Sequence, residues 1–145
     1  MGRTAYSSPE DQRKAALRRR ADARRLLEAG ANHTRGAMYL AGYAVECKIK
    51  AVAMERFGCR TLAGLAQKWK VDERDVYTHN LEVLLGRLGI LARLQASPVG
   101  SDFRFQVNRW RTSWRYDRHN PTLPQANAFL DAVDRVLRWL EANRC

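Results

Sequence analysis

One segment near the middle of the chain is apolar on almost every side when it is drawn as a helix. The segment is MYLAGYAVECKIKAVAM, residues 38–54. One of its faces contains Met38, Ala41, Val45, Ile49 and Val52, and another contains Leu40, Cys47, Ala51 and Met54. Such a helix has to be covered by other elements, because exposing it to water would cost free energy. The segment predicts the central helix of a bundle, running from about His33 or Thr34 to Arg56.

The region before this segment predicts a long basic helix. Ser8 is a suitable N-cap, Pro9 suits the first helical position, and Gly30 suits the end of the helix. Its narrow apolar stripe consists of Ala16, Ala23 and Leu27. We expect Arg19 and Arg20, which flank the stripe, to extend toward water or to find acidic partners.

The second half of the chain predicts further helices. TLAGLAQKW, residues 61–69, suits a short helix, and HNLEVLLGRLGILARL, residues 79–94, carries leucines at helical spacing. Residues 95–102 are expected to form a loop. The next helix begins at Ser101 or Asp102 and carries Phe103, Val107, Trp110 and Trp114, and the last helix begins at Pro124.

These elements predict an all-α protein, specifically an up-and-down antiparallel four-helix bundle with a short extra helix. The length of 145 residues suits one domain over residues 1–145, with residues 1–8 expected to be flexible. No alternation of apolar and polar residues indicates a strand.

The charge balance favours polyanionic partners. The chain has 26 Lys and Arg against 15 Asp and Glu, a formal net charge of +11, and its densest basic run is LRRRADARR, residues 17–25. Its three cysteines, at positions 47, 59 and 145, lack the spacing of a disulfide framework or a zinc site. No apolar run approaches the about 20 residues of a membrane span, and no signal peptide is evident. We therefore expect a cytoplasmic protein without a membrane segment.

Several kinds of site are excluded by their missing motifs. The chain has no glycine-rich phosphate loop and no nucleophile elbow. His33, His79 and His119 are far apart and lack metal-ligand spacing with cysteines or carboxylates. We expect neither a metal nor a cofactor, and we expect Cys47 to be a core residue.

One candidate site lies in SWRYDRHNP, residues 113–121. Arg115 and His119 are four positions apart and would share one helix face. Such a pair could bind a phosphate, or act on RNA with His119 as general base. Pro121 disfavours helix at Asn120, so the alternative is a structural helix end.

The neighbouring residues extend this candidate site. Trp110 and Trp114 suit the core, which leaves Arg111, Arg115 and Tyr116 to form a surface beside them. RDVYTH, residues 74–79, offers a second pairing of Arg74 with His79. In the structural alternative, His79 helps to cap the helix that follows, with Thr78 as the N-cap.

Three segments in order resemble the HEPN family, the higher-eukaryote-and-prokaryote nucleotide-binding domains. AMYLAGYAVECKIKAVA, residues 37–53, resembles the family's second helix, with Glu46 and Lys50 four apart. THNLEVLL, residues 78–85, resembles the opening of its third helix. WRTSWRY, residues 110–116, followed by ANAFLDAVDRVLRWLE resembles its Trp…Arg-Tyr segment and long last helix.

The resemblance implies a helical bundle that often forms a homodimer. Such proteins are often encoded beside a small nucleotidyltransferase and act with it as a toxin–antitoxin-like pair. Some are metal-independent ribonucleases that use an Arg, a polar residue directly after it, and a His after four to six intervening residues. Here Tyr116 follows Arg115, and only three residues separate Arg115 from His119. Arg74 and His79 have the family's spacing but precede the third helix.

The sequence therefore leaves three hypotheses. The leading one is a non-enzymatic HEPN-type module that binds a nucleotide, a nucleic acid such as RNA, or a nucleotidyltransferase partner. Its binding residues would be Arg111, Arg115, Tyr116, His79 and Asn80. The alternatives are a metal-independent endoribonuclease with Arg115 and His119 as catalytic residues, and a purely structural dimer subunit.

Overall fold

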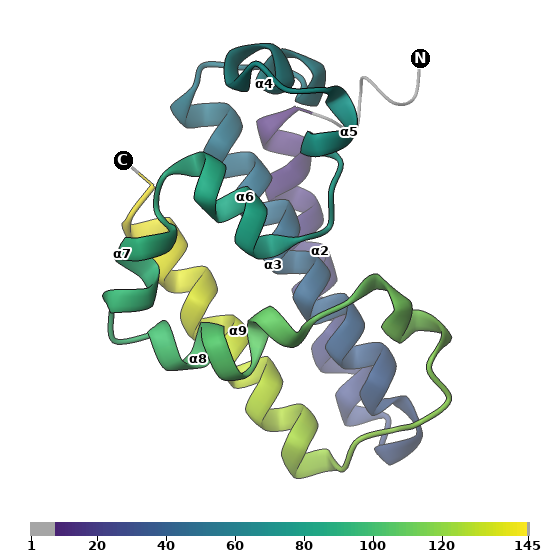
Figure 1. Ribbon diagram of the computed structural model, residues 1–145. Helices are drawn as coiled ribbons and strands as arrows, with labels where there is room; N and C mark the ends of the chain where they lie inside the picture. Colours follow the sequence, from purple (N-terminus) through teal and green to yellow (C-terminus); the bar gives the residue numbers. More distant parts are fainter. Residues whose placement is uncertain (1–7, 145) are drawn as a thin grey trace.

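The computed structural model describes residues 8–144, and every regular element among them is helical. The long helices are α2 (Pro9–Glu28), α3 (Thr34–Arg56) and α9 (Leu123–Ala142). The short helices are α4 (Leu62–Trp69), α5 (Glu73–Val76), α6 (Leu81–Leu88), α7 (Leu91–Ala96) and α8 (Gly100–Phe105), with 3-10 turns η1 (Ala31–His33), η2 (Val107–Arg109) and η3 (Thr112–Tyr116). The all-α prediction is confirmed (Figure 1). The flexibility predicted for residues 1–8 concerns residues 1–7, which lie outside the described part, and Ser8.

Helix α3 is the central element, as its sequence predicts. It contacts α2, α4, α6, η3 and α9, and its buried residues lie on several sides. The predicted boundaries of α2 and α3 are confirmed, with the Ser8 hydroxyl accepting a hydrogen bond from the Asp11 amide at 3.1 Å. The connection between α2 and α3 is short because Gly30 adopts a φ of 114°, which a residue with a side chain rarely does. Helix α2 therefore packs directly along α3 (Figure 1).

Helix α9 begins one residue earlier than its proline suggests. Thr122 and Gln125 form a capping box, which places Leu123 and Pro124 in the first turn. The predicted apolar stripe is buried, and it consists of Ala126, Phe129, Val133, Val136 and Leu140. This stripe packs α9 against α3.

The predicted helix over residues 79–94 is wrong, because it breaks into α6 and α7. Gly89 adopts a φ of 86° at the end of α6, and its amide bonds to the Leu85 carbonyl at 3.0 Å. This left-handed residue turns the chain and lets Ile90 enter the core. The predicted loop over 95–102 is also wrong at both ends, because α7 continues to Ala96 and α8 begins at Gly100.

The predicted long helix from Ser101 or Asp102 is wrong as well. Helix α8 ends at Phe105, and Trp110 has the extended backbone angles φ −56° and ψ 136°. The Trp110 indole instead lies over Gly42 of α3, and its Nε1 donates to the Tyr39 carbonyl at 2.9 Å. The packing of the Trp110 side chain on α3 thus breaks the helix that the spacing of the apolar residues predicted. A run of short helices stands where a long fourth helix was expected, so the four-helix arrangement is not confirmed.

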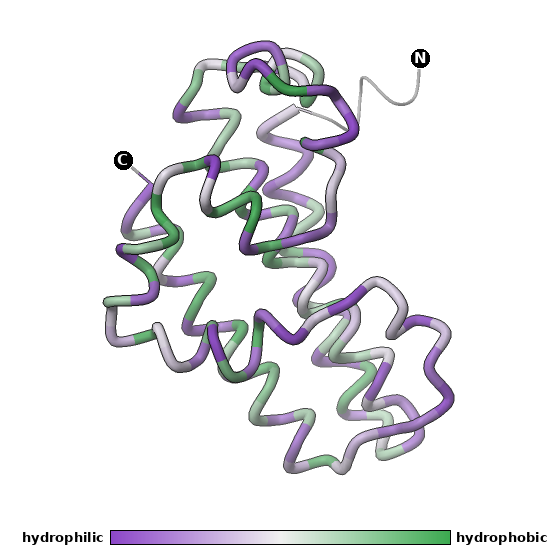
Figure 2. Tube along the Cα trace, in the orientation of Figure 1, coloured by the Kyte–Doolittle hydropathy of each residue, from purple (hydrophilic) through white to green (hydrophobic). Residues whose placement is uncertain are grey.

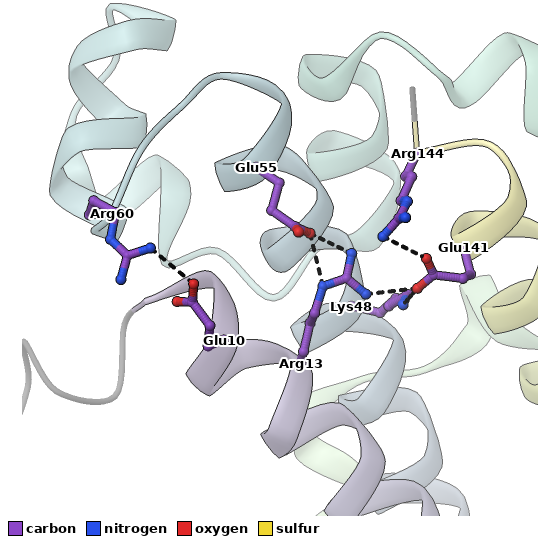
Figure 3. Close-up of polar contacts among 7 residues, drawn as sticks. All are labelled: Glu10, Arg13, Lys48, Glu55, Arg60, Glu141 and Arg144. Atoms are coloured by element: carbon purple, nitrogen blue, oxygen red, sulfur yellow. Dashed lines mark hydrogen bonds and ion pairs between the residues drawn. The ribbon is translucent and has the colours of Figure 1, made fainter.

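Ion pairs join the basic face of α2 to the acidic residues of α9 and α3. Arg20 and Arg24 both bond to Asp134, at 2.6 and 2.9 Å. Burial works against ionised Asp134, but the hydrogen bonds from the two arginines outweigh burial and lower the pKa of this carboxyl. At the other end of α2, Arg13 bridges Glu55 and Glu141, and Lys48 also pairs with Glu141 (Figure 3).

The close approach of Trp110 to Gly42 generates a stability prediction. A Cβ at position 42 would lie 2.1 Å from Trp110 Cδ1, so Gly42→Ala displaces the indole. We expect the free energy of unfolding to fall by about 1–3 kcal/mol in urea titrations. The matched control is Gly86→Ala on α6, where nothing lies within 4 Å and helix propensity adds about 0.5–1 kcal/mol. Equal changes in the free energy of unfolding for the two substitutions would contradict the close packing of Trp110 on Gly42.

The Glu141 cluster generates a pH prediction. Hydrogen bonds from Lys48 and Arg13 lower the pKa of Glu141 from 4.5 to about 2. The lowered pKa means that the folded protein favours the ionised form of Glu141 more than the unfolded chain does. The contribution of Glu141 to the free energy of unfolding is therefore complete above pH 4.5 and is lost as the pH falls toward 2. The side chain is partly exposed, so solvent screening limits the contribution to about 0.5–1 kcal/mol.

The measurement is urea unfolding of Glu141→Gln and the unsubstituted protein from pH 7 down to pH 2. We expect Glu141→Gln to be the less stable at pH 7 and the difference to shrink as Glu141 is protonated. A difference that does not change with pH would exclude this cluster as its source.

Candidate anion-binding site

Within residues 8–144, arginines without an acidic partner lie both in the basic run of α2, as Arg18, Arg19 and Arg25, and in a segment after α8. In residues 104–119, the side chains of Arg104, Arg109, Arg115 and Arg118 form no ion pair with any carboxylate of residues 8–144. The one acid of this segment, Asp117, pairs with Arg35. Figure 2 shows that the stretch from η3 to α9 is mostly hydrophilic. We call residues 104–119 the arginine segment.

Two aromatic rings project from the arginine segment into solvent. Tyr116 is 75% exposed and Phe105 is 63% exposed. Each lies beside an arginine, with the Arg115 guanidinium 4.9 Å from the Tyr116 ring centre and that of Arg104 5.9 Å from the Phe105 ring centre. Exposed rings flanked by unpaired guanidinium groups can stack on planar ligands and hold anions.

The core role predicted for the two tryptophans of this segment is confirmed for Trp110 and holds in part for Trp114. Trp110 is buried, and Trp114 is partly buried against Phe129 with ring centres 5.4 Å apart. Arg111 is less available than predicted, because its Nη1 donates to the Asn108 and Trp110 carbonyls at 2.8 and 2.7 Å. Its side chain stabilises the turn between η2 and η3.

A cavity of about 500 Å³ lies beside the arginine segment, between the starts of α3 and α9. It is lined by the basic side chains of Arg35, Arg109 and His119, by Gln106 and Gln125, and by apolar atoms of neighbours such as Pro121. Among residues 8–144, no carboxylate belongs to this lining. The cavity therefore has the size and the sign of charge to receive an anion.

Arg35 is held firmly at this cavity. Its guanidinium lies 4.4 Å from the Trp114 ring centre, and its Nε lies 3.2 Å from Asp117 Oδ2. The angle to Asp117 does not suit a hydrogen bond, so the buried Nε–H has no acceptor in the described structure. The nearby loop is tied to the start of α3, since Thr34 Oγ1 donates to the Pro121 carbonyl at 2.6 Å. These contacts hold the Arg35 guanidinium at the edge of the cavity.

The structure separates the predicted pair Arg115 and His119. Helical geometry ends at Tyr116, so the two side chains do not share a helix face. The His119 backbone amide donates to Asp117 Oδ1 at 3.0 Å, and His119 lines the cavity, whereas Arg115 does not. The arginines that accompany His119 at the cavity are Arg35 and Arg109.

The second predicted pairing also does not form. Arg74 is exposed on α5 and lies 3.4 Å from Asp72, whereas the Nδ1 of His79 lies 2.7 Å from Glu46 Oε1. The N-cap of α6 is Asn80, whose Oδ1 accepts from the Val83 amide at 3.1 Å, so the prediction of Thr78 as the cap is wrong. The Asn80 side chain therefore has a structural role.

His79, whose side chain is half exposed, completes a polar network around the buried Glu46. Glu46 is almost fully buried, and its Oε2 accepts from Lys50 Nζ at 2.9 Å while its Oε1 faces His79. An ionised carboxylate only accepts hydrogen bonds, so this contact suits the tautomer of His79 that carries a proton on Nδ1. The Nε2 of His79 has no protein partner in residues 8–144. Glu46 and Lys50 belong to one of the three segments that resemble the HEPN family, and His79 belongs to another. These two segments meet in this network.

The sequence reasoning missed three residues of this region, namely Arg35, Arg109 and Phe105. Arg35 and Arg109 come from elements that are far apart in the chain, and no local motif marks their meeting at one cavity. The described residues contain no cluster of three or more His, Cys, Asp or Glu side chains suited to a metal. Cys47 is a core residue as predicted, and burial raises the pKa of its thiol to about 12.

Comparison with protein families, with curated proteins and with solved structures finds no match to this chain. The resemblance to the HEPN family therefore stays a prediction from the sequence motifs. Within residues 8–144, none of the helices combines the length and apolar character needed to cross a bilayer.

The buried network generates a stability prediction. Glu46→Ala leaves the Lys50 ammonium buried without its partner, which lowers the free energy of unfolding by about 3–5 kcal/mol in urea titrations. The control is the double variant Glu46→Leu, Lys50→Met, which replaces both charges by apolar groups and recovers most of that loss. A loss below about 1 kcal/mol for Glu46→Ala would show that this network is hydrated in solution.

Proposed function

We propose that this protein is a HEPN-type helical module that binds RNA through the arginine segment. The observation that carries the proposal is the set of arginines without acidic partners next to two exposed aromatic rings. Guanidinium groups bind phosphates along a strand, and exposed rings stack on unpaired bases. The net charge of +11 would support the approach of such a polyanion.

Single-stranded RNA suits this surface better than a duplex. The rings of Phe105 and Tyr116 are exposed side chains that stack on a base only if the base is unpaired. The surface is carried by short helical turns and loops, so it presents no long helix for insertion into a groove. Arg115 and Tyr116, two of the residues predicted from the sequence, belong to this surface.

The HEPN resemblance adds three proposals about the wider assembly. We propose a homodimer, a small nucleotidyltransferase as protein partner in a toxin–antitoxin-like pair, and a cytoplasmic location. The bundle of the family would here use α2, α3 and α9, with the run from α6 to η3 as its broken fourth member. The support for these proposals is the order of the three motifs in the chain.

We do not propose ribonuclease activity. A metal-independent cleavage by Arg115 and His119 requires both side chains to act on one phosphate, and only His119 lines the cavity. The same purified protein can be incubated with RNA in EDTA to test this position. Cleavage that is lost in both Arg115→Ala and His119→Ala would overturn it.

The RNA-binding proposal is tested by fluorescence anisotropy with a labelled single-stranded oligoribonucleotide over a salt series. We expect Tyr116→Ala to lose about 1–3 kcal/mol of binding free energy, because a stacked base loses its platform. Arg115→Ala should weaken binding and reduce the slope of log K against log salt by about 1.

The matched control is Arg18→Ala, which removes an exposed, unpaired arginine of the same charge from α2. We expect it to bind RNA nearly as the unsubstituted protein does. If Arg18→Ala and Arg115→Ala weaken binding equally, the net charge and not the arginine segment is responsible. If no RNA binds even at low salt, the proposal fails.

A further inference from the structure

The cavity between α3 and α9 differs in kind from the open surface of the arginine segment. It brings together two guanidinium groups and an imidazole, from Arg35, Arg109 and His119, with the amide groups of Gln106 and Gln125 beside them. These five side chains come from four parts of the chain, so the tertiary structure alone assembles them. They provide donors around one volume of about 500 Å³, the size of a small-molecule site.

We propose that this cavity is a binding site for a phosphomonoester, namely the terminal phosphate of a nucleotide or of an RNA strand. A phosphomonoester carries about two negative charges near neutral pH and three strong acceptor oxygens. Paired guanidinium groups match such a group through charge-assisted, bidentate hydrogen bonds. An internal phosphodiester suits the cavity less well, because it carries only one negative charge and the strand would have to leave the cavity on both sides of the phosphate.

The electrostatic surroundings support a strongly anionic ligand. No carboxylate of the described residues lines the cavity, and Asp117, two positions before His119, is engaged by the Arg35 side chain and the His119 amide. The Nε–H of Arg35 has no hydrogen-bond acceptor in the described structure, although the residue is largely buried.

The cavity can hold more than the phosphate. Met38, Pro121 and Pro124 give it an apolar wall, against which a sugar or base can pack. Gln106, Arg109 and His119 belong both to the cavity and to the arginine segment, so a strand that starts in the cavity can continue over that segment. The strand-end source rests on the proposed RNA binding, whereas the nucleotide source does not.

The test measures binding of AMP and adenosine by isothermal titration calorimetry at low salt. We expect AMP to bind at least about tenfold more tightly than adenosine, which corresponds to about 1.4 kcal/mol. Arg109→Ala and His119→Ala, both exposed positions, should each weaken AMP binding. Arg35→Ala should weaken it further, and its folding is checked by circular dichroism because Arg35 packs on Trp114.

The second arm compares oligoribonucleotides of one sequence with a 5′-phosphate, a 3′-phosphate or neither. If a strand end is the ligand, one phosphorylated form binds about tenfold more tightly than the unphosphorylated form, and Arg109→Ala abolishes that preference. Arg115→Ala is the matched control, since Arg115 lies outside the cavity; it weakens all three oligonucleotides and leaves the preference and AMP binding intact.

The outcomes separate the two proposals. AMP binding without RNA binding supports the cavity site and overturns the proposed function. A preference for a phosphorylated strand end without AMP binding supports the strand-end source. If AMP binds no better than adenosine and the three oligonucleotides bind alike, the cavity is no phosphomonoester site. This conclusion holds whether or not the protein binds RNA.

Discussion

The contact between Trp110 and Gly42 determines the shape of the region in which the candidate sites lie. The Trp110 indole approaches α3 so closely that no side chain fits beneath it, and Gly42 provides that place. The Nε1–H of Trp110 bonds to the Tyr39 carbonyl, and its ring stacks near the Tyr39 ring, so the position is fixed by both hydrogen bonding and packing. Because Trp110 enters the core with an extended backbone, the chain before and after it cannot be one helix. The short turns η2 and η3 result, and they present Arg109, Arg115 and Tyr116 outward.

The distribution of unpaired charge follows from the packing of α2. The run LRRRADARR contains the highest density of arginines in the sequence, but Arg20 and Arg24 of this run are paired with acids of α9, and Arg19 lies over the Tyr43 ring. The ion pairs of Arg20 and Arg24 stabilise the packing of α2 against α9, and the Arg19 contact stabilises the packing of α2 against α3. Arg18 and Arg25 of the run have no acidic partner within residues 8–144, so unpaired charge alone does not distinguish the arginine segment from α2. The arginine segment differs because its unpaired arginines lie beside the exposed rings of Phe105 and Tyr116.

Two kinds of polar group occur in this protein, and they differ in what surrounds them. Glu46, Lys50 and His79 satisfy one another around a buried carboxylate, so their arrangement is explained by the cost of burying charge. Arg35, Arg109 and His119 surround an open volume and have no carboxylate in common there. The first group ties the start of α6 to α3, and the second is the better candidate for a ligand. His79, which the sequence suggested for binding, belongs to the first group.

The amino-acid sequence by itself determined the helical class, the limits of α2 and α3, the buried stripe of α9 and the core positions of Trp110 and Cys47. These features depend on local spacing and capping, which adjacent residues specify. Only the tertiary structure decided that the helices predicted over 79–94 and from Ser101 onward would break, and which arginines would lack acidic partners. The backbone angles of Gly89 and Trp110 depend on how neighbouring side chains pack in the core. Arg35 comes close to Arg109 and His119 only after α3 and α9 have packed. A site assembled from distant elements leaves no pattern in the chain, because no local interaction connects its residues.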